Sequence, residues 1–368
     1  MNILIAPNAF KGSLSAIEVA EIIQSTLLKI DPKYTCRCLP IADGGDGTFD
    51  VLANHYKGEI HSFSTTDLLD RHINAPLYLT ENGTAIIELT HVAGLNLLKS
   101  SEYAPLNTHT FGVGVLIRSA LDLKCKKIIL AIGGSGTLDM GFGALRALGI
   151  RFLDSEDHEL TGGGGKLNLI SKIDTRNFDI RLLDVDFQIA CDVENPLLGE
   201  KGAAPVFGKQ KGASDEELVF LHQNHQHFAR LIEKQFQINI TKMKFCGAAG
   251  GISAGLHALC GAKLRSGSDM ILDCLNMDEA IETADILITG EGRIDSQSAF
   301  GKAPYVLAQK AKHLGKRVFA FCGTAENLPN SPFERIFSIK KDEQSQSEAM
   351  QLARTNLEDA VFEIQSWI

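Results

Sequence analysis

Short apolar runs alternate with stretches of helical periodicity along most of this chain. ILIAP near the N-terminus and KKIILAIGG at 126–134 are rich in β-branched residues, which predicts buried strands. Ser15-Ala16-Ile17-Glu18 has the form of a capping box, and apolar residues then recur at helical spacing until Asp31-Pro32. Strands that alternate with helices predict an α/β fold with a mostly parallel sheet covered on both faces.

Three further segments read as helices. Residues 113–123 precede the strand at 126–134, residues 138–148 follow it and stop at Gly149, and a polar helix runs over 214–236. TGGGGK at 161–166 is typical of a flexible loop. His222, His225 and His227 have the spacing of a metal site, but their glutamate- and glutamine-rich helix favours a solvated face.

Gly-rich turns follow apolar or small residues at several places in the chain. The turns, with the residues that lead into them, are ILIAPNAFKGS (3–13), LPIADGGDGT (39–48), IILAIGGSGTLDMG (128–141), FCGAAGG (245–251) and ILITGEGRIDSQSAFGK (286–302). A strand that opens into such a turn presents backbone N–H groups to an anion. Acidic residues, lysines or hydroxyls follow in most of them. The repetition predicts an enzyme that handles a charged, phosphorylated ligand.

The common nucleotide signatures are missing from these turns. Gly301-Lys302-Ala303 and Gly165-Lys166-Leu167 lack the Ser or Thr that a Walker A motif requires. Gly134-Ser135-Gly136 and Gly290-Glu291-Gly292 each lead to an aspartate instead of the last glycine of the Rossmann fingerprint. This disfavours an oxidoreductase that binds a dinucleotide.

The turns do supply the groups that phosphoryl transfer needs, namely cations for phosphate oxygens and carboxylates for Mg²⁺ and for the attacking hydroxyl. The residues able to supply them are Lys11, Asp43, Asp46, Asp192, Arg293, Asp295 and Lys302. Each also has a structural interpretation. Asp43 and Asp46 could cap a helix that begins at Thr48, Lys11 could be a solvated turn lysine, and Asp192 a helix cap or turn former.

Composition narrows the class of protein. A length of 368 residues suggests two domains. With 36 basic and 45 acidic residues the net charge is −9, and the absence of a basic stripe disfavours a general nucleic-acid binder. The eight cysteines form no CxxC pair, which favours a reducing cytoplasm. We see no secretory signal and no apolar run long enough to cross a membrane, so we expect a cytoplasmic protein without a membrane partner.

Several of these motifs, in this order, resemble those of the type I glycerate kinases of bacteria. They are APNAFKGSLSA (6–16), PIADGGDGT (40–48), GGSGTLDMGFGALRALG (133–149), CDVENPLLGEKGAAPVFGKQKGA (191–213), GAAGG (247–251) and TGEGRIDSQSAFGKAP (289–304). The likeness covers essentially the whole chain. It differs at Gly136 and Leu138, where the family usually has Ala and Asn, and at Asp70, where it usually has Gly.

The resemblance implies an enzyme that uses ATP and Mg²⁺ to phosphorylate D-glycerate, most often to 2-phosphoglycerate. It also implies two α/β domains with a cleft between them. One is a Rossmann-like three-layer sandwich built from both chain ends (1–68 and 278–368), and the other is an inserted middle domain (69–277). A glycerate 3-kinase, a kinase of a related hydroxy acid and a non-catalytic sugar-acid sensor remain alternatives, and the oligomeric state is open.

The predicted roles follow from chemistry. We expect Asp192 to orient the attacking hydroxyl, Lys11 to neutralise phosphate charge and Arg293 to clamp the carboxylate, because a guanidinium matches a carboxylate in a bidentate way. These three are the catalytic candidates. The candidates for binding substrate or phosphate are Asp43, Gly44, Gly45, Asp46, Gly134, Ser135, Gly290, Gly292, Asp295 and Lys302, of which Asp43 and Asp46 could also hold Mg²⁺.

Overall fold

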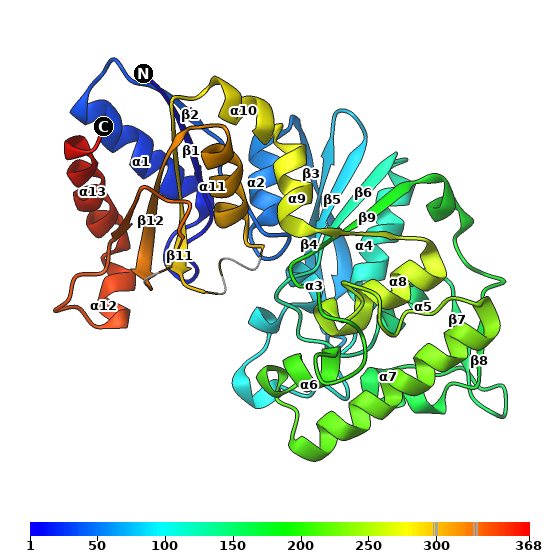
Figure 1. Ribbon diagram of the computed structural model, residues 1–368. Helices are drawn as coiled ribbons and strands as arrows, with labels where there is room; N and C mark the ends of the chain where they lie inside the picture. Colours follow the sequence, from blue (N-terminus) through cyan, green and yellow to red (C-terminus); the bar gives the residue numbers. More distant parts are fainter. Residues whose placement is uncertain (297, 299–300, 327, 329) are drawn as a thin grey trace. The chain divides into compact units, whose positions relative to one another are not determined.

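The described chain forms two compact α/β units (Figure 1). The computed structural model describes residues 1–296, 298, 301–326, 328 and 330–368. Unit 1 contains Met1–Asp43, Asp50–His55 and Ser268–Ile368, and unit 2 contains Gly44–Phe49 and Tyr56–Gly267. Each unit has its own sheet and helices, so the prediction of two α/β domains is confirmed.

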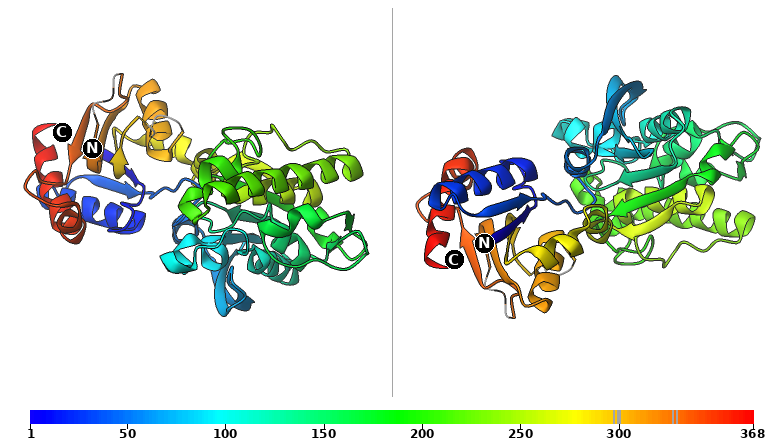
Figure 2. Two further views of the ribbon diagram at one scale, coloured as in Figure 1. Left: turned by 90° about the horizontal axis from the view of Figure 1, so that it is seen from below. Right: turned by 90° about the horizontal axis from the view of Figure 1, so that it is seen from above.

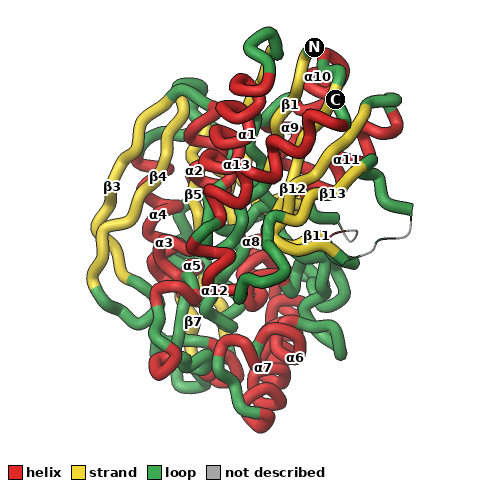
Figure 3. The backbone as a smooth tube through the Cα atoms, turned by 90° about the vertical axis from the view of Figure 1, so that its left-hand side faces the viewer, coloured by secondary structure: helices red, strands yellow, loops and turns green. Residues whose placement is uncertain are grey.

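The limits of these units differ from the predicted limits 1–68, 69–277 and 278–368. Strand β3 (Gly58–Thr66) pairs along its whole length with β4 (His72–Thr80) in the sheet of unit 2. Figure 3 shows the two strands as a long curved hairpin. Contacts therefore group residues 58–66 with the middle of the chain. The limits predicted from the sequence stay a prediction.

Unit 1 is built on an all-parallel sheet, which over the described residues has five strands in the order β13-β12-β11-β1-β2. Its strands are β1 (Asn2–Pro7), β2 (Thr35–Cys38), β11 (Ile286–Ile294), β12 (Arg317–Ala325) and β13 (Arg335–Ser338). Its helices are α1 (Ala16–Ile30), α10 (Met277–Thr283), α11 (Ala303–His313), α12 (Gln346–Gln351) and α13 (Ala353–Glu363), with α9 (Gly267–Cys274) and α2 (Thr48–His55) at the points where the chain changes unit.

Alternate side chains of the central strands of unit 1 pack on opposite faces of the sheet. Ile3, Ile288 and Phe319 belong to one apolar cluster with the buried sides of α1 and α13. Helix α11 contacts the strands β11 and β12, and α10 contacts β1. Because helices cover the central strands, these strands are almost continuous apolar runs, as the sequence predicts.

Unit 2 is built on a mixed sheet with the strand order β10-β9-β6-β5-β4-β3 over the described residues. The parallel strands are β5 (Thr84–Glu88), β6 (Lys127–Ala131), β9 (Asp186–Cys191) and β10 (Lys263–Ser266), and β7 (Arg151–Leu153) pairs separately with β8 (Lys172–Asp174). The parallel strands β5, β6 and β9 are buried on both faces, whereas β3 alternates with exposed positions. The hairpin therefore leaves one face of its strands to solvent.

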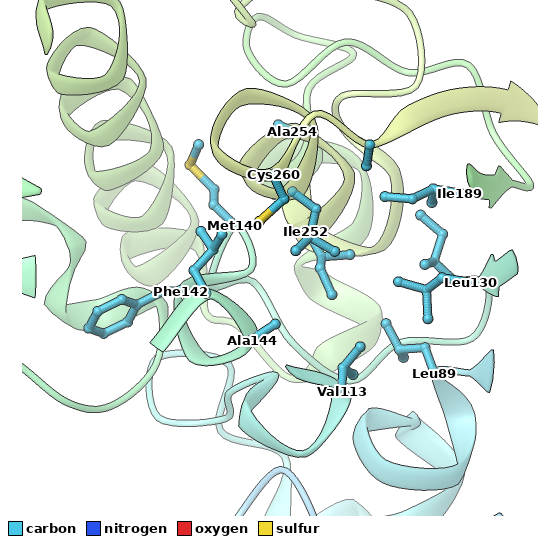
Figure 4. Close-up of a cluster of buried hydrophobic side chains, with 14 of the residues drawn as sticks. Leu89, Val113, Leu130, Met140, Phe142, Ala144, Ile189, Ile252, Ala254 and Cys260 are labelled. Atoms are coloured by element: carbon cyan, nitrogen blue, oxygen red, sulfur yellow. The ribbon is translucent and has the colours of Figure 1, made fainter. Parts of the chain in front are cut away.

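The helices of unit 2 enclose the larger apolar core. They are α3 (Thr90–Ala93), α4 (Phe111–Asp122), α5 (Phe142–Ala147), α6 (Ala203–Phe207), α7 (Asp215–Phe236) and α8 (Ile252–Cys260). Figure 4 shows Leu130 and Ile189 of the sheet beside Ile252 of α8, with Val113 of α4 and Phe142 of α5 in the same cluster. The long helix α7 is seen along its length in Figures 1 and 2.

Most of the predicted elements are confirmed, with one shifted boundary. Ser15 caps α1 through a capping box, and helices form at 111–122 and 215–236. The helix predicted to start at residue 138 begins instead at Phe142. Met140 and Gly141 have φ angles of 52° and 77°, which a right-handed helix cannot accommodate.

Two local interpretations are corrected. His225 is fully buried and hydrogen-bonds to the carbonyl of Leu138, so the interpretation of a solvated face is wrong for His225, whereas His227 is exposed. Burial lowers the pKa of His225 to about 4. The segment predicted as a flexible loop enters a 3₁₀ helix at Gly164, where Asn224 donates a hydrogen bond to the Gly164 carbonyl.

All eight cysteines are free thiols. Burial raises the pKa of Cys38, Cys246 and Cys322 to about 12 and that of Cys125 to about 11. Within the described part of the chain, every helix is too short or too polar to cross a lipid bilayer.

Asp139 is a structural acid that joins two helices of unit 2. Its carboxylate is fully buried and accepts hydrogen bonds from the Thr110 N–H (2.9 Å) and Oγ1 (2.8 Å), the Gly143 N–H (3.0 Å) and the Gly141 N–H (3.1 Å). It thereby fixes the start of α5 against the residue that precedes α4.

We expect Asp139→Ala to lower the free energy of unfolding by about 3 kcal/mol or more, because several buried donors lose their acceptor. Urea unfolding followed by circular dichroism measures the change. Asp122→Ala, which removes an exposed carboxylate of α4, is the matched control and should leave the midpoint near wild type. Equal midpoints for the two variants would contradict the structural role.

Candidate functional site

The carboxyl ends of β1 and β11 form the topological switch point of unit 1. The chain leaves β1 through α1 for β2 on one side, and leaves β11 through α11 for β12 on the other. Open parallel sheets bind ligands at such a point, where the loops diverge. Most of the predicted site residues of unit 1 lie in the loops at this edge.

Asp43 connects three segments of unit 1. Its carboxylate accepts hydrogen bonds from Asn8 Nδ2 after β1 (2.6 Å), from the Ala303 N–H at the start of α11 (2.6 Å) and from Ser268 Oγ (3.4 Å). The carboxylate therefore stabilises the N-terminus of α11, not the helix at Thr48 that the sequence offered as its alternative role.

Lys302 and Glu291 form an ion pair at the end of β11. Lys302 Nζ lies 2.7 Å from Glu291 Oε2, and the Glu291 side chain is only 8% exposed. Burial raises the pKa of Glu291, and the neighbouring Lys302 opposes that rise. The predicted phosphate ligand Lys302 is therefore held in place by a buried acid.

Arg293 lies on the surface between two carboxylates. Its guanidinium contacts Glu326 (2.6 Å) and Asp295 (3.0 Å), and 63% of the side chain is exposed. These contacts raise the pKa of Arg293, the hydrogen bond to Glu326 contributing most. The predicted role of Arg293 as a carboxylate clamp stays a prediction.

Lys11 lines a small hollow of unit 1 with a volume of about 40 Å³. Gly292, Thr324 and Lys340 also line it. A Cβ atom on Gly292 would lie 3.3 Å from the Lys11 backbone nitrogen, so glycine lets the loop after β1 approach the end of β11. Lys11 and Lys340 give this hollow a cationic character that suits an anion.

In unit 2, the segment Gly44–Phe49 lies on the carboxyl edge of the parallel strands. The Gly44 carbonyl accepts hydrogen bonds from the N–H groups of Ile132 (3.1 Å) and Gly133 (3.3 Å), which follow β6. A Cβ on Gly133 would come within 2.6 Å of the Gly45 Cα. Only glycine allows this approach of two backbones, which explains why both motifs are glycine-rich.

Glu88, at the end of β5, binds the backbone of the same segment, Gly44–Phe49. Its buried carboxylate accepts hydrogen bonds from the N–H groups of Phe49 (2.9 Å) and Gly47 (3.3 Å) and from the Thr90 hydroxyl. Burial raises the pKa of Glu88, although these hydrogen bonds favour the carboxylate. Asp46, immediately before the anchored Gly47, is exposed and has no hydrogen-bond partner among the described residues.

A pocket of about 250 Å³ opens at this edge of unit 2. Its lining includes Gly134, Ser135, Asp192, Gln210 and Lys211. Ser135 is 6% exposed and Lys211 is 2% exposed.

Two charges of opposite sign line this pocket. Lys211 Nζ donates to Ser135 Oγ (2.7 Å) and to the Thr137 carbonyl (2.8 Å). Burial lowers the pKa of Lys211 to about 7, while the charges of Asp192 and Asp139 act in the opposite direction. Asp192, at the end of β9, is exposed, and a Cβ on Gly133 would come within 3.0 Å of its Oδ2.

The structure separates the predicted site residues into two groups. Those of unit 1 are Lys11, Asp43, Gly290, Gly292, Arg293, Asp295 and Lys302, and those of unit 2 are Gly44, Gly45, Asp46, Gly134, Ser135 and Asp192. Gly290 differs from the rest of its group, because a Cβ there would meet the Phe321 carbonyl at 2.1 Å inside the sheet. Its glycine is required by strand packing.

Sequence reasoning missed Asn8, Glu88 and Lys211 as members of these groups. Glu88 had a signal, since it ends the apolar strand run AIIE. Lys211 lies in the quoted motif GKQKGA, but its sequence neighbours are polar and give no sign of burial. Leu138 has a fully buried side chain in the core of unit 2, so the position at which the chain departs from the family pattern contributes packing.

Each α/β unit carries loops at the carboxyl edge of its parallel strands, and an ammonium and a carboxylate line the pocket of unit 2. These features define an enzyme for small anionic substrates. Comparison with known proteins identifies the family. The glycerate kinase family model matches residues 3–368, and the chain belongs to this family of enzymes.

Relatives cover nearly the full chain. Glycerate 2-kinase of Escherichia coli K12 is 38% identical over 97% of this chain and 95% of its own length. Glycerate kinase of Bacillus subtilis 168 is 40% identical over 92% and 90%. A crystal structure from Salmonella typhimurium LT2, described as glycerate kinase 2, superposes with a TM-score of 0.88 at 37% identity and covers 100% of this chain and 98% of its own. The resemblance found from the motifs is confirmed.

We expect Glu88→Gln to loosen the segment Gly44–Phe49, because the amide NH₂ would face N–H donors that now meet a carboxylate oxygen. Hydrogen exchange of a peptide that covers residues 44–49 should become faster. The free energy of unfolding should fall by about 2 kcal/mol.

Glu81→Gln is the matched control, since Glu81 is an exposed acid in the turn before β5. Exchange of the same peptide should match wild type in this control. Unchanged exchange in Glu88→Gln would show that Glu88 does not hold the segment.

Proposed function

We propose that this glycerate kinase transfers the γ-phosphoryl group of ATP, with Mg²⁺, to the 2-hydroxyl group of D-glycerate. The observation that carries the proposal is the pocket of unit 2, where a carboxylate and an ammonium line one space suited to a small hydroxy acid. The name of the Escherichia coli relative, glycerate 2-kinase, supports the choice of hydroxyl.

ATP fits the carboxyl edge of unit 1 in this proposal. The switch point between β1 and β11 is the usual ligand site of an open parallel sheet. Lys11 and Lys302 supply cationic charge for phosphate oxygens, and Arg293 is a third cation in the same set of loops. The ion pair with Glu291 keeps the Lys302 side chain ordered before the nucleotide binds.

Magnesium is a hard cation that prefers carboxylate oxygens, and it usually takes one or two of them in addition to phosphates and water. Asp46 fits this requirement, because it is exposed and its oxygens have no donor among the described residues. Asp43 fits less well, since Asn8 and Ala303 already bond its two oxygens. When bound, Mg²⁺ would neutralise part of the negative charge of the phosphates.

Asp192 is the group that would orient the attacking hydroxyl. It is the carboxylate at the carboxyl end of β9 and lines the pocket. A carboxylate within hydrogen-bond reach of a hydroxyl accepts its proton as the new bond to phosphorus forms. Ser135 and the glycine backbone of 133–134 form the adjoining wall.

The product identifies the reacting hydroxyl. We expect phosphorus NMR of a reaction with D-glycerate and MgATP to show 2-phosphoglycerate. Coupling of the phosphorus to one proton, on C2, distinguishes it from 3-phosphoglycerate, where phosphorus couples to the two protons on C3. A product with the second pattern would replace the proposal with a glycerate 3-kinase.

We expect Asp192→Asn to lower kcat by about 100-fold or more with little change in KM for ATP, since general-base assistance is worth roughly 10²- to 10⁴-fold. A coupled assay for ADP release measures both constants. Asp184→Asn, an exposed acid just before β9, is the control and should behave as wild type. Normal turnover of a folded Asp192→Asn variant would remove Asp192 from this role.

A further inference from the structure

Lys211 is a buried cation on the pocket of unit 2 whose role in the proposed reaction is still unassigned. Its side chain belongs to the 3₁₀ turn Lys209–Lys211 and is 2% exposed. The described residues provide its ammonium with two neutral acceptors, Ser135 Oγ and the Thr137 carbonyl, and with no ion-pair partner. A buried charge is costly unless it is paired, so an ammonium buried at this pocket without an ion-pair partner favours a ligand of opposite charge.

The surroundings of Lys211 show what would pair with it. An ammonium has three N–H donors, and the acceptors Ser135 Oγ and the Thr137 carbonyl leave one donor for a ligand. Ser135 accepts from Lys211 through its oxygen, so its own O–H can donate to the same ligand. Both residues line the pocket of about 250 Å³.

The size of the pocket limits the ligand. Pockets for drug-sized molecules range over roughly 300–1,000 Å³, so this one suits a small organic anion better than a whole nucleotide. Asp192 on the same lining would repel a carboxylate but accept a hydrogen bond from a hydroxyl. The two charges therefore match the two ends of a small hydroxy acid.

We propose that Lys211, with Ser135, binds the carboxylate of D-glycerate and so orients the substrate with its hydroxyl toward Asp192. This assignment rests on the proposed function and specifies its substrate subsite. It gives the role of carboxylate clamp to Lys211 in place of Arg293, whose guanidinium already contacts two carboxylates.

The first test compares an acid with its neutral analogue. In Lys211→Met, kcat/KM for D-glycerate should fall about 100-fold, because a charge-assisted contact with the substrate is lost. In the same variant, kcat/KM for D-glyceramide, whose amide replaces the carboxylate, should fall less than about threefold, because no charged contact is lost. KM for ATP should stay near wild type.

Lys209→Met is the matched control. Lys209 belongs to the same turn, is 67% exposed and pairs with Asp215 at 2.8 Å. Its loss should leave both substrates unaffected. Equal losses for D-glycerate and D-glyceramide in Lys211→Met would overturn the assignment, as would a selective rise of KM for D-glycerate in Arg293→Lys without one in Lys211→Met.

The pH profile of the wild-type enzyme tests the same assignment without a variant. The titratable groups that interact electrostatically with Lys211 are Asp139, Asp192 and His225. Burial keeps His225 neutral above its pKa of about 4. Burial lowers the pKa of Lys211 to about 7, so the ammonium is lost as the pH rises through neutrality. kcat/KM for D-glycerate should therefore fall above about pH 7, relative to D-glyceramide.

The sign of this profile separates two roles of Lys211. A lysine that acted as the general base would need its neutral form, and kcat/KM would rise through the same range. A rise or a flat ratio would overturn the assignment. Failure of the proposed function is distinct, because it would appear as no turnover of D-glycerate by the wild-type enzyme or as phosphorylation at C3.

Discussion

The approach of two glycine backbones, at Gly45 and Gly133, is the constraint on which the site of unit 2 depends. A Cβ on Gly45 would lie 3.2 Å from the Gly133 Cα, and the reverse distance is shorter still. The approach lets the Gly44 carbonyl accept the N–H groups after β6. Because the two glycines lie 88 positions apart in the sequence, neither motif can be understood from its own neighbours.

Carboxylates stabilise the backbone of the loops that the glycines bring together. Glu88 takes up the N–H groups of Gly47 and Phe49, which would otherwise be buried without acceptors, and Asp139 does the same for the start of α5. In unit 1, Asp43 has the same relation to the start of α11. These three acids bind the protein's own backbone, and Glu88 thereby fixes the segment that carries the exposed acid Asp46.

Much of the fold could be predicted from local pattern alone. The capping box at Ser15, the buried strand at 127–131 and the polar helix at 215–236 depend on residues a few positions apart, and the sequence shows them directly. The start of α5 was misplaced, because the positive φ of Met140 depends on Gly250, whose carbonyl accepts the Met140 N–H. Tertiary contacts of this kind override local periodicity.

The sequence predicts those site residues that directly follow an apolar strand. It does not predict polar residues that are buried by contacts with distant parts of the chain. Asp192 and Ser135 follow apolar runs, so their place at a sheet edge could be expected. Lys211 gets its partners from residues 74 and 76 positions earlier, and nothing in GKQKGA marks it as buried. Asp70 shows the converse. Its φ of 63° lies in the left-handed region that favours glycine, and this agrees with the glycine that the resemblance implied at that position.

The free thiols add a practical consequence. With pKa values near 12, the thiols of Cys38, Cys246 and Cys322 have roughly one thiolate in 10⁵ molecules at pH 7, and only the thiolate attacks an electrophile or a disulfide. A thiol reagent would therefore modify the buried thiols of Cys246 and Cys322 at an appreciable rate only after the surrounding structure has opened. Since Cys322 belongs to unit 1 and Cys246 to unit 2, these two native cysteines report local opening in each half of the molecule.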